Sequence, residues 1–215
     1  MPGRVLAAVY DKMNAGPEAA GVAALRAELL ATARGATLEV GAGTGLNLEH
    51  YPVAVSRLVI TEPEPHMRTR LEEKVRRSGR RAELRADPVE ALAFPDDTFD
   101  TIVCTMLLCT VADPAVALAE LGRVLAPGGR LLVLEHVRSE RPRVARLQDA
   151  VRPLYAIIGR GCHPNRDTLA NIRAAGFEVG AHRREIAPKT PSTENELLVG
   201  EASWGRPAAA QAPSV

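Results

Sequence analysis

The sequence predicts an α/β fold in which a mostly parallel sheet carries helices on both faces and ends in an antiparallel last strand. Short apolar runs of the kind found in buried strands alternate with helical stretches from residue 37 to residue 176. This alternation favours parallel strands joined by helical crossovers. The last two strand-like runs follow each other without a helix, which indicates a hairpin at one edge of the sheet.

Residues 1–34 precede the first strand and predict a separate helical segment. The segment is rich in Ala and Leu, and the stretch NAGP interrupts it, so we expect two helices at residues 4–13 and 18–33. The sheet domain then spans residues 35–204. The remaining residues, 205–215, read GRPAAAQAPSV and are expected to be disordered, because they offer too little apolar surface to pack.

Seven runs within the sheet domain predict strands, and prolines mark the ends of two of them. Pro63 and Pro65 stop the second run and Pro88 stops the third, because proline cannot donate to a strand ladder. The expected strands cover residues 37–40, 57–63, 82–88, 99–108, 130–137, 178–186 and 195–204.

The helices between these strands are expected to end at glycine or proline. Gly79 and Gly176 suit helix C-termini, and Pro-Gly-Gly closes a third helix. Pro153 is expected to break a helical region of irregular pattern. The expected helices begin near Leu46, cover residues 67–79, 114–129 and 143–158, and finally include the stretch NRDTLANIRAAGF.

Composition and charge exclude several classes of function. The chain carries 27 Lys and Arg against 26 Asp and Glu, so it predicts no nucleic-acid-binding surface. Its three cysteines form no CxxC pair and no metal-ligand spacing, so no metal site is expected and the thiols should be reduced, as in a cytoplasmic protein. No apolar stretch is long enough to span a membrane, and no secretory signal is visible.

The turn after the first expected strand carries the most informative motif, LEVGAGTG, at residues 38–45. Gly41, Gly43 and Gly45 follow the pattern G-x-G-x-G, whereas a dinucleotide fingerprint needs G-x-G-x-x-G and Leu46 occupies its last position. Glu39 lies just upstream, where a negative charge opposes a pyrophosphate but suits a positively charged ligand. S-adenosylmethionine carries both an ammonium and a sulfonium group.

Two further acidic residues end the next two expected strands. A carboxylate at Glu62 can accept hydrogen bonds from ribose hydroxyls, and one at Asp87 can accept from an adenine amino group. Carboxyl ends of parallel strands meet at one edge of the sheet, where ligands bind. The three strand ends together predict a nucleoside-containing ligand.

These motifs resemble those of class I S-adenosylmethionine-dependent methyltransferases. LEVGAGTG looks like their first motif and TEP like their acidic second-strand end. RADPVEALAFPDDTFDTIVC is similar to their third motif and following strand, and LGRVLAPGGRLLVLEHV to their fifth-strand segment. The resemblance covers roughly residues 35–180 and implies a Rossmann-like, seven-stranded fold that uses S-adenosylmethionine and has residues 1–34 as a helical lid.

The resemblance also implies roles for individual residues of the cofactor site. The glycines would pack against the methionyl part of the cofactor, and the strand-end acids would hold its ribose and adenine. Tyr10 could reach the cofactor carboxylate from the lid. The full implied set is Tyr10, Glu39, Gly41, Gly43, Gly45, Asn47, Glu62, Pro63, Asp87, Pro88, Cys104 and Thr105.

A closer resemblance concerns the methyl acceptor. VCTMLLCTV, LEHVRSER and GRGCHPNRDTLANIRAAGF look like the subgroup that includes animal thiol S-methyltransferases. Those animal proteins carry an N-terminal membrane anchor that this sequence does not show, so no membrane anchor is carried over. We expect a small-molecule methyl acceptor, with a thiol as one candidate, and a monomer or homodimer.

His136, at the end of the fifth expected strand, is the leading candidate for a catalytic general base, with His163 second. Cys109 and Cys162 are interpreted first as packing residues. Two alternatives remain open from the sequence, a nicotinamide-dependent oxidoreductase and a non-catalytic protein that binds the same cofactor.

Overall fold

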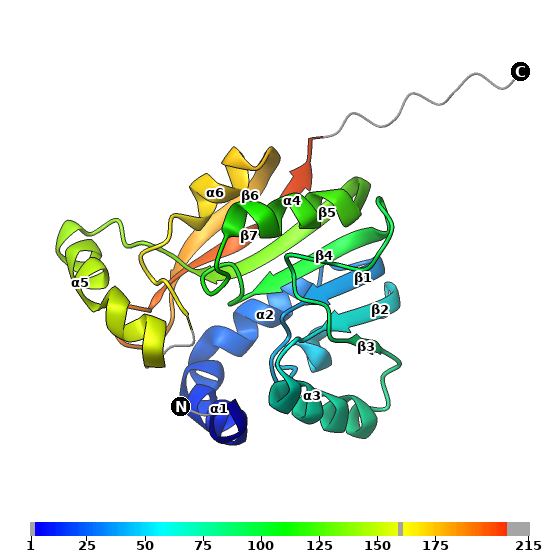
Figure 1. Ribbon diagram of the computed structural model, residues 1–215, viewed down its shortest axis with the longest axis horizontal. Helices are drawn as coiled ribbons and strands as arrows, with labels where there is room; N and C mark the ends of the chain where they lie inside the picture. Colours follow the sequence, from blue (N-terminus) through cyan, green and yellow to red (C-terminus); the bar gives the residue numbers. More distant parts are fainter. Residues whose placement is uncertain (1–2, 159–160, 206–215) are drawn as a thin grey trace, which may run out of the picture.

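A computed structural model describes residues 3–158 and 161–205 of the protein, built around one seven-stranded sheet (Figure 1). The spatial order of the strands is β3-β2-β1-β4-β5-β7-β6. The strands are β1 (Gly35–Val40), β2 (Val55–Thr61), β3 (Glu83–Arg85), β4 (Phe99–Thr105), β5 (Leu125–His136), β6 (Phe177–Ile186) and β7 (Glu196–Trp204). The helices are α1 (Gly3–Pro17), the π-helical η1 (Glu18–Val22), α2 (Ala23–Leu30), the 3₁₀ turn η2 (Leu48–His50), α3 (Pro65–Ser78), α4 (Pro114–Val124), α5 (Pro142–Ile158) and α6 (Thr168–Ala174).

The strand directions confirm the predicted fold class. Strands β1 to β5 pair in parallel, whereas β7 runs antiparallel between β5 and β6. The predicted edge hairpin is therefore real, and its second strand lies inside the sheet. Because the strand order reverses between β1 and β4, the crevice at their carboxyl ends is the expected ligand position of this fold.

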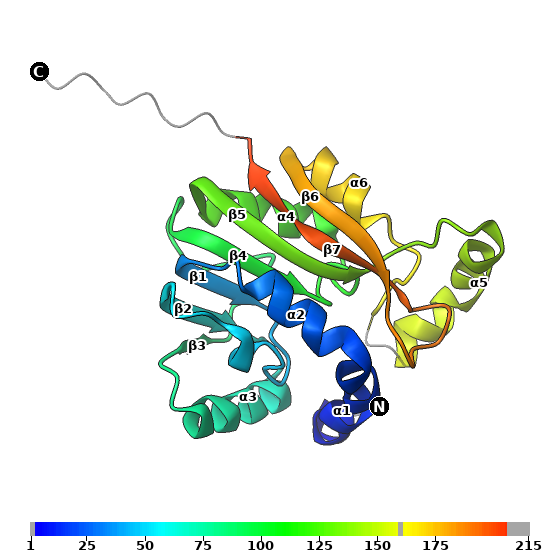
Figure 2. The same cartoon turned by 180° about the vertical axis from the view of Figure 1, so that it is seen from behind.

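Helices cover both faces of the sheet and bury two separate apolar layers. Helices α4 and α6 lie over one face, where Leu118 packs with Ile102 (Figure 1). Helices α2 and α3 cover the opposite face, where Leu30 and Leu71 pack with Ile60 (Figure 2). The strands between these layers read as continuous apolar runs because both of their faces are buried.

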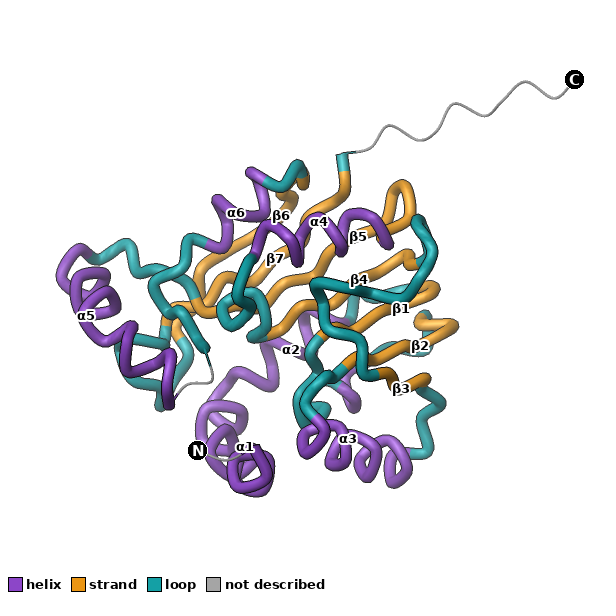
Figure 3. The backbone as a smooth tube through the Cα atoms, in the orientation of Figure 1, coloured by secondary structure: helices purple, strands orange, loops and turns teal. Residues whose placement is uncertain are grey.

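Helices α1 and α5 lie beyond the carboxyl ends of the parallel strands rather than over the sheet (Figure 3). Helix α1 is attached to the glycine-rich turn by a hydrogen bond from Thr44 Oγ1 to Asp11, and to α3 by a 2.9 Å ion pair between Lys74 Nζ and Asp11. The two helices thus flank the crevice.

The predicted helix beginning near Leu46 is wrong, because only the short η2 turn forms there. Asn47 and Tyr51 turn inward and hydrogen-bond to the buried carboxylate of Glu39. The turn ends at Tyr51, which adopts an extended conformation, because a residue that precedes proline, here Pro52, is disfavoured in the helical region.

Three other predicted boundaries also need correction. The helix expected at 114–129 ends at Val124, because Leu125 adopts an extended conformation and pairs with Phe99, so β5 begins there. The strand expected at 99–108 ends at Thr105, and Met106 then takes a left-handed backbone conformation. Helix α5 runs through Pro153 without the predicted break, so the lost backbone donor is tolerated on this peripheral helix.

Among the described residues, no helix combines the length and apolar character needed to cross a bilayer. The tail predicted to be disordered lies outside the described residues from residue 206 onward.

Candidate functional site

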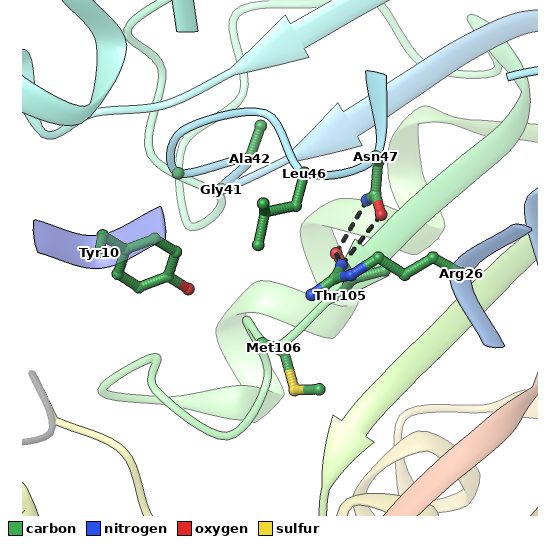
Figure 4. Close-up of a pocket in the computed structure, with 9 residues that line it drawn as sticks. Tyr10, Arg26, Gly41, Ala42, Leu46, Asn47, Thr105 and Met106 are labelled. Atoms are coloured by element: carbon green, nitrogen blue, oxygen red, sulfur yellow. Dashed lines mark hydrogen bonds between the residues drawn. The ribbon is translucent and has the colours of Figure 1, made fainter. Parts of the chain in front are cut away.

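A small pocket opens at the carboxyl ends of β1 and β4, at the place where the strand order reverses (Figure 4). Five of the residues implicated by the sequence line it together with Arg26, Ala42, Leu46 and Met106. These five are Tyr10, Gly41, Gly43, Asn47 and Thr105.

The glycine-rich turn supplies the floor of the pocket. Gly41 and Gly43 have φ values of +62° and +59°, a region that L-residues with side chains rarely adopt. A side-chain carbon at Gly41 would stand 2.5 Å from Leu107 Cδ1, whereas one at Gly43 would meet only Tyr10, at 4.0 Å. Gly43 thus presents bare backbone to the space beneath Tyr10, which suits a ligand that approaches the main chain closely.

Gly45 has a different role from its two neighbours. A side-chain carbon there would stand 2.7 Å from Leu71 Cδ1, so this glycine allows the turn to pack against α3. It does not line the pocket.

Arg26 is the main site residue that the sequence analysis missed. It is 4% exposed and pairs with Glu18 at 3.1 Å. Its Nη1 atom donates to Asn47 Oδ1 at 2.9 Å and to Thr105 Oγ1 at 3.1 Å (Figure 4). An arginine is seldom buried without such partners, and this one places a fixed positive charge in the pocket wall.

A signal for Arg26 exists in the sequence. It follows Val22 by four residues and precedes Leu29 and Leu30 by three and four, so it lies on the apolar stripe of an amphipathic helix. A charged residue on a buried stripe indicates a specific partner.

Glu39 lies behind the pocket wall and holds Asn47. Asn47 Nδ2 donates to one carboxylate oxygen at 2.9 Å, and the Tyr51 hydroxyl donates to the other at 2.7 Å. Burial raises the pKa of Glu39 to about 7, although these hydrogen bonds and Arg26 oppose the shift. Glu39 therefore lies beside the pocket as predicted, but it does not line the pocket itself and acts by orienting Asn47.

Glu62 connects the end of β2 to the glycine-rich turn. Its carboxylate accepts from the backbone N–H of Gly43 at 2.7 Å and from that of Glu64 at 2.8 Å. A carboxylate has about four acceptor positions, and these two bonds occupy one on each oxygen. This placement is compatible with the predicted ribose-binding role.

Three residues predicted to surround the adenine, Pro63, Asp87 and Pro88, do not line the pocket. Asp87 instead pairs with Arg85 Nε at 2.7 Å and accepts from the N–H of Ala93, and the Arg85 hydrogen bond lowers the pKa of Asp87. Pro63 and Pro88 are exposed. Cys104, also predicted for the cofactor site, is fully buried in the core layer beneath α4.

His136, the predicted base, faces two cysteine sulfurs. Its Nδ1 atom lies 3.7 Å from Cys109 Sγ and 3.9 Å from Cys162 Sγ. A hydrogen bond from Cys109 together with His136 lowers the pKa of Cys162, whereas the same hydrogen bond and burial raise that of Cys109. Sequence reasoning treated these three residues separately and did not predict that they would meet.

The pocket fits the cofactor implied by the sequence motifs. Arg26 and Thr105 offer donors for a carboxylate, the glycine backbone offers a cradle, and Glu62 offers acceptors for hydroxyls. Tyr10 closes the pocket from α1, and burial raises the pKa of its hydroxyl, which therefore stays protonated as a donor. The donor set thus suits a ligand with a carboxylate and a ribose.

Comparison with known protein families and curated proteins gives a consistent assignment. The sequence pattern of the family described as "Methyltransferase domain" matches residues 38–133. Human thiol S-methyltransferase TMT1B is 32% identical over 162 residues, which cover 74% of this chain and 66% of the human protein. A phosphatidylethanolamine N-methyltransferase from Cereibacter sphaeroides is 34% identical over 58% of this chain and 62% of its own length. The chain thus spans less than two thirds of the length of the curated relatives that it matches.

Solved structures show the same fold. A protein from Thermotoga maritima, described as an S-adenosylmethionine-dependent methyltransferase and possible histamine N-methyltransferase, superimposes with a TM-score of 0.67. It is 22% identical, and the match covers 90% of this chain and 93% of that protein. At this identity the likeness establishes the fold.

Proposed function

The chain belongs to the class I S-adenosylmethionine-dependent methyltransferases, and we propose that it transfers a methyl group from this cofactor to the sulfur of a small-molecule thiol. The observation that carries the methyl-transfer proposal is the buried Arg26, fixed by Asn47 and Thr105 beside the glycine-rich turn. It provides a site for the cofactor carboxylate at the position where the fold binds its ligands.

Each part of the proposed cofactor site has a distinct task. Arg26 and Tyr10 hold the carboxylate, Asn47 is oriented by Glu39, and Glu62 accepts from the ribose. When bound, S-adenosylmethionine would supply a methyl group whose bond to the positively charged sulfur breaks as the acceptor attacks the methyl carbon in line. The chain's contribution is mainly to hold the two reactants in that alignment and to exclude water.

The choice of a thiol acceptor rests on the names of the relatives and on the chemistry of thiols. Rat thiol S-methyltransferase TMT1B is 34% identical over 65% of this chain and 59% of its own length. A thiol is partly ionised near neutral pH and then needs no strong base, whereas a phenol or carbon acid does. We assign the acceptor side of the crevice to α1, to residues 138–158 and 161–165, and to residues 187–194.

Incubation of the purified chain with isotopically labelled S-adenosylmethionine and a panel of thiols, phenols and amines tests this proposal. We expect labelled thioether from at least one thiol, detected by mass spectrometry. Activity confined to phenols or amines, phosphatidylethanolamine included, would refute S-methylation and retain methyl transfer.

Calorimetry separates the two other classes of function. Tight binding of a nicotinamide dinucleotide without binding of S-adenosylmethionine would support an oxidoreductase. Binding of S-adenosylmethionine without turnover on the whole panel would support a non-catalytic cofactor-binding protein.

A further inference from the structure

The three residues Cys109, His136 and Cys162 form a cluster that the methyl-transfer proposal does not use. One ligand atom from each residue lies within 4.8 Å of the other two. The residues come from three separate segments, namely the loop after β4, the end of β5 and the loop before α6. Among the described residues this is the one group of its kind with the donor atoms of a metal site.

The spacing of the donor atoms matches tetrahedral coordination. Zinc binds cysteine sulfur at about 2.3 Å and histidine nitrogen at about 2.0–2.1 Å, so a tetrahedral site separates these atoms by roughly 3.6 Å. The two sulfur–nitrogen separations here are 3.7 Å and 3.9 Å. A tetrahedral site places its two sulfurs about 3.8 Å apart. All three ligand atoms here lie within 4.8 Å of one another, so small side-chain rotations would bring them onto one ion.

Backbone contacts fix the segments that carry the two cysteines. The N–H of His163 donates to the carbonyl of Cys109 at 2.7 Å, which joins the two cysteine loops directly. Arg166 Nη1 donates to the carbonyl oxygens of Leu108 and Val111, at 2.5 and 2.9 Å. The cluster is therefore held by the fold on both sides.

The buried Glu135 fixes the loop after β4 from below. Its carboxylate accepts from the backbone N–H groups of Leu107, Leu108 and Cys109 at 2.8–3.1 Å. This acid is used for positioning, so the donor set of the cluster consists of two sulfurs and one nitrogen. Such a soft set selects Zn²⁺ or Cu⁺ over Mg²⁺ or Ca²⁺.

We propose that Cys109, His136 and Cys162 bind one Zn²⁺ ion as a Cys₂His site with a fourth position left for an exogenous ligand. Two thiolates neutralise the dication, and each thiol releases its proton to solvent on binding. Three protein ligands with an open position are typical of reactive rather than purely structural zinc sites. The inference stands independently of the identity of the methyl acceptor, and it makes His136 a ligand in place of the predicted base.

Metal titration of the full chain tests the site without any activity assay. The protein is reduced, stripped with a chelator and titrated with Co²⁺ and then with Zn²⁺ against a chromophoric chelator. We expect one equivalent of Co²⁺ to produce sulfur-to-cobalt charge-transfer bands and intense tetrahedral d–d bands. Binding of either ion to the metal-free protein should release the two thiol protons, and Zn²⁺ should then displace bound Co²⁺.

Single substitutions identify the ligands. We expect Cys109→Ala, Cys162→Ala and His136→Gln each to lower zinc affinity by more than about tenfold, since even loss of an outer-shell partner has an effect of that size. Cys104→Ala, which removes a buried thiol outside the cluster, and His182→Gln, which removes an exposed imidazole, serve as matched controls and should bind as the wild type does.

X-ray absorption spectroscopy of the zinc-loaded wild type keeps the test valid if a variant fails to fold. Two sulfur and at least one nitrogen scatterers around zinc would support the site. Coordination without sulfur, absence of a stoichiometric ion, or a Cys109–Cys162 disulfide in protein purified under reducing conditions would overturn it.

Discussion

Arg26 Nη1 donates a 2.9 Å hydrogen bond to Asn47 Oδ1, and this contact joins a helix that precedes the sheet to the glycine-rich turn within it. Asn47 in turn donates to Glu39, so charge, amide and carboxylate form one buried chain. Because each member orients the next, the pocket at the glycine-rich turn depends on a side chain of α2 that lies 21 residues before Asn47.

Replacement of Arg26 should weaken cofactor binding. Arg26→Met removes the buried charge and leaves Glu18 without its partner, and hydrogen bonds of charged groups contribute about 1.5–3 kcal/mol. We expect the Kd for S-adenosylmethionine, measured by calorimetry, to rise roughly 10- to 100-fold. Arg81→Met, at an exposed arginine, should leave it unchanged. Unaltered affinity in a folded Arg26→Met variant would contradict the assigned role.

Glu39 should make stability depend on pH. Its pKa in the folded state is raised to about 7 by burial, so folding disfavours the charged form. Its stabilising contribution is fully present below the pKa of the unfolded chain and is lost as pH rises towards about 7. We expect urea unfolding to show wild type losing stability relative to Glu39→Gln over that interval, by up to about 3 kcal/mol. A difference that is constant from pH 4 to pH 8 would exclude this shift.

The two pocket glycines should respond differently to alanine. Both substitutions strain a left-handed backbone, which costs about 1–2 kcal/mol. Gly41→Ala also drives a carbon to 2.5 Å from Leu107, so it should destabilise the fold by roughly 1–3 kcal/mol more than Gly43→Ala in chemical denaturation. Gly43→Ala should chiefly reduce cofactor affinity. Equal stability of the two variants would argue against the close contact with Leu107.

Asp11 should control the attachment of α1. Its bonds to Thr44 and Lys74 connect this helix to the glycine-rich turn and to α3. Because such partly exposed pairs contribute at most about 1 kcal/mol, Asp11→Ala should leave the melting temperature nearly unchanged. Limited proteolysis within residues 3–17 should become faster, and cofactor should dissociate faster. Asp149→Ala, which breaks the pair between Asp149 on α5 and Arg138 before that helix, is the control and should alter neither rate.

Cys162 should be the most reactive of the three thiols in metal-free protein. The Cys109 hydrogen bond and His136 lower its pKa, whereas burial raises the pKa of Cys104. We expect iodoacetamide to modify Cys162 first, with a rate that levels off at lower pH than for an ordinary thiol, as followed by peptide mass spectrometry. His136→Gln should move this plateau to higher pH. Labelling of Cys104 or Cys109 before Cys162 would contradict this prediction, since both of those thiols are also less exposed.

Much of the fold could be predicted from the sequence, because strands and helix ends depend on apolar runs and on glycine or proline residues nearby in the chain. The positions of Gly43 and Glu62 at one crevice followed from the rule that parallel strands share a ligand-binding edge, and a 2.7 Å hydrogen bond joins them. The short turn in place of the helix expected after Leu46 has a local signal, because Pro52 disfavours the helical conformation at Tyr51. The hydrogen bonds from Asn47 and Tyr51 to Glu39 are tertiary contacts that no local pattern predicts.

Contacts between residues far apart in the sequence explain why other features of the site were not predicted. The loops of Cys109 and Cys162 are joined by a hydrogen bond from the His163 N–H to the Cys109 carbonyl, and neither loop carries a metal-binding motif. Asp87 has the residue type and strand-end position expected of a ligand contact, yet its carboxylate forms an ion pair with Arg85, two residues before it. Sequence spacing alone does not reveal which of two available partners a carboxylate selects.

The insertion of β7 between β5 and β6 has a consequence for biosynthesis. Residues 177–186 are made before residues 196–204, and among the described residues β7 is the one strand that pairs with β6. On the ribosome, β5 therefore keeps an unpaired edge until residues 196–204 emerge, and an exposed edge is a site of non-native association. Synthesis halted before Glu196 should yield a nascent chain that recruits chaperones, whereas release after Trp204 allows the sheet to close in one step.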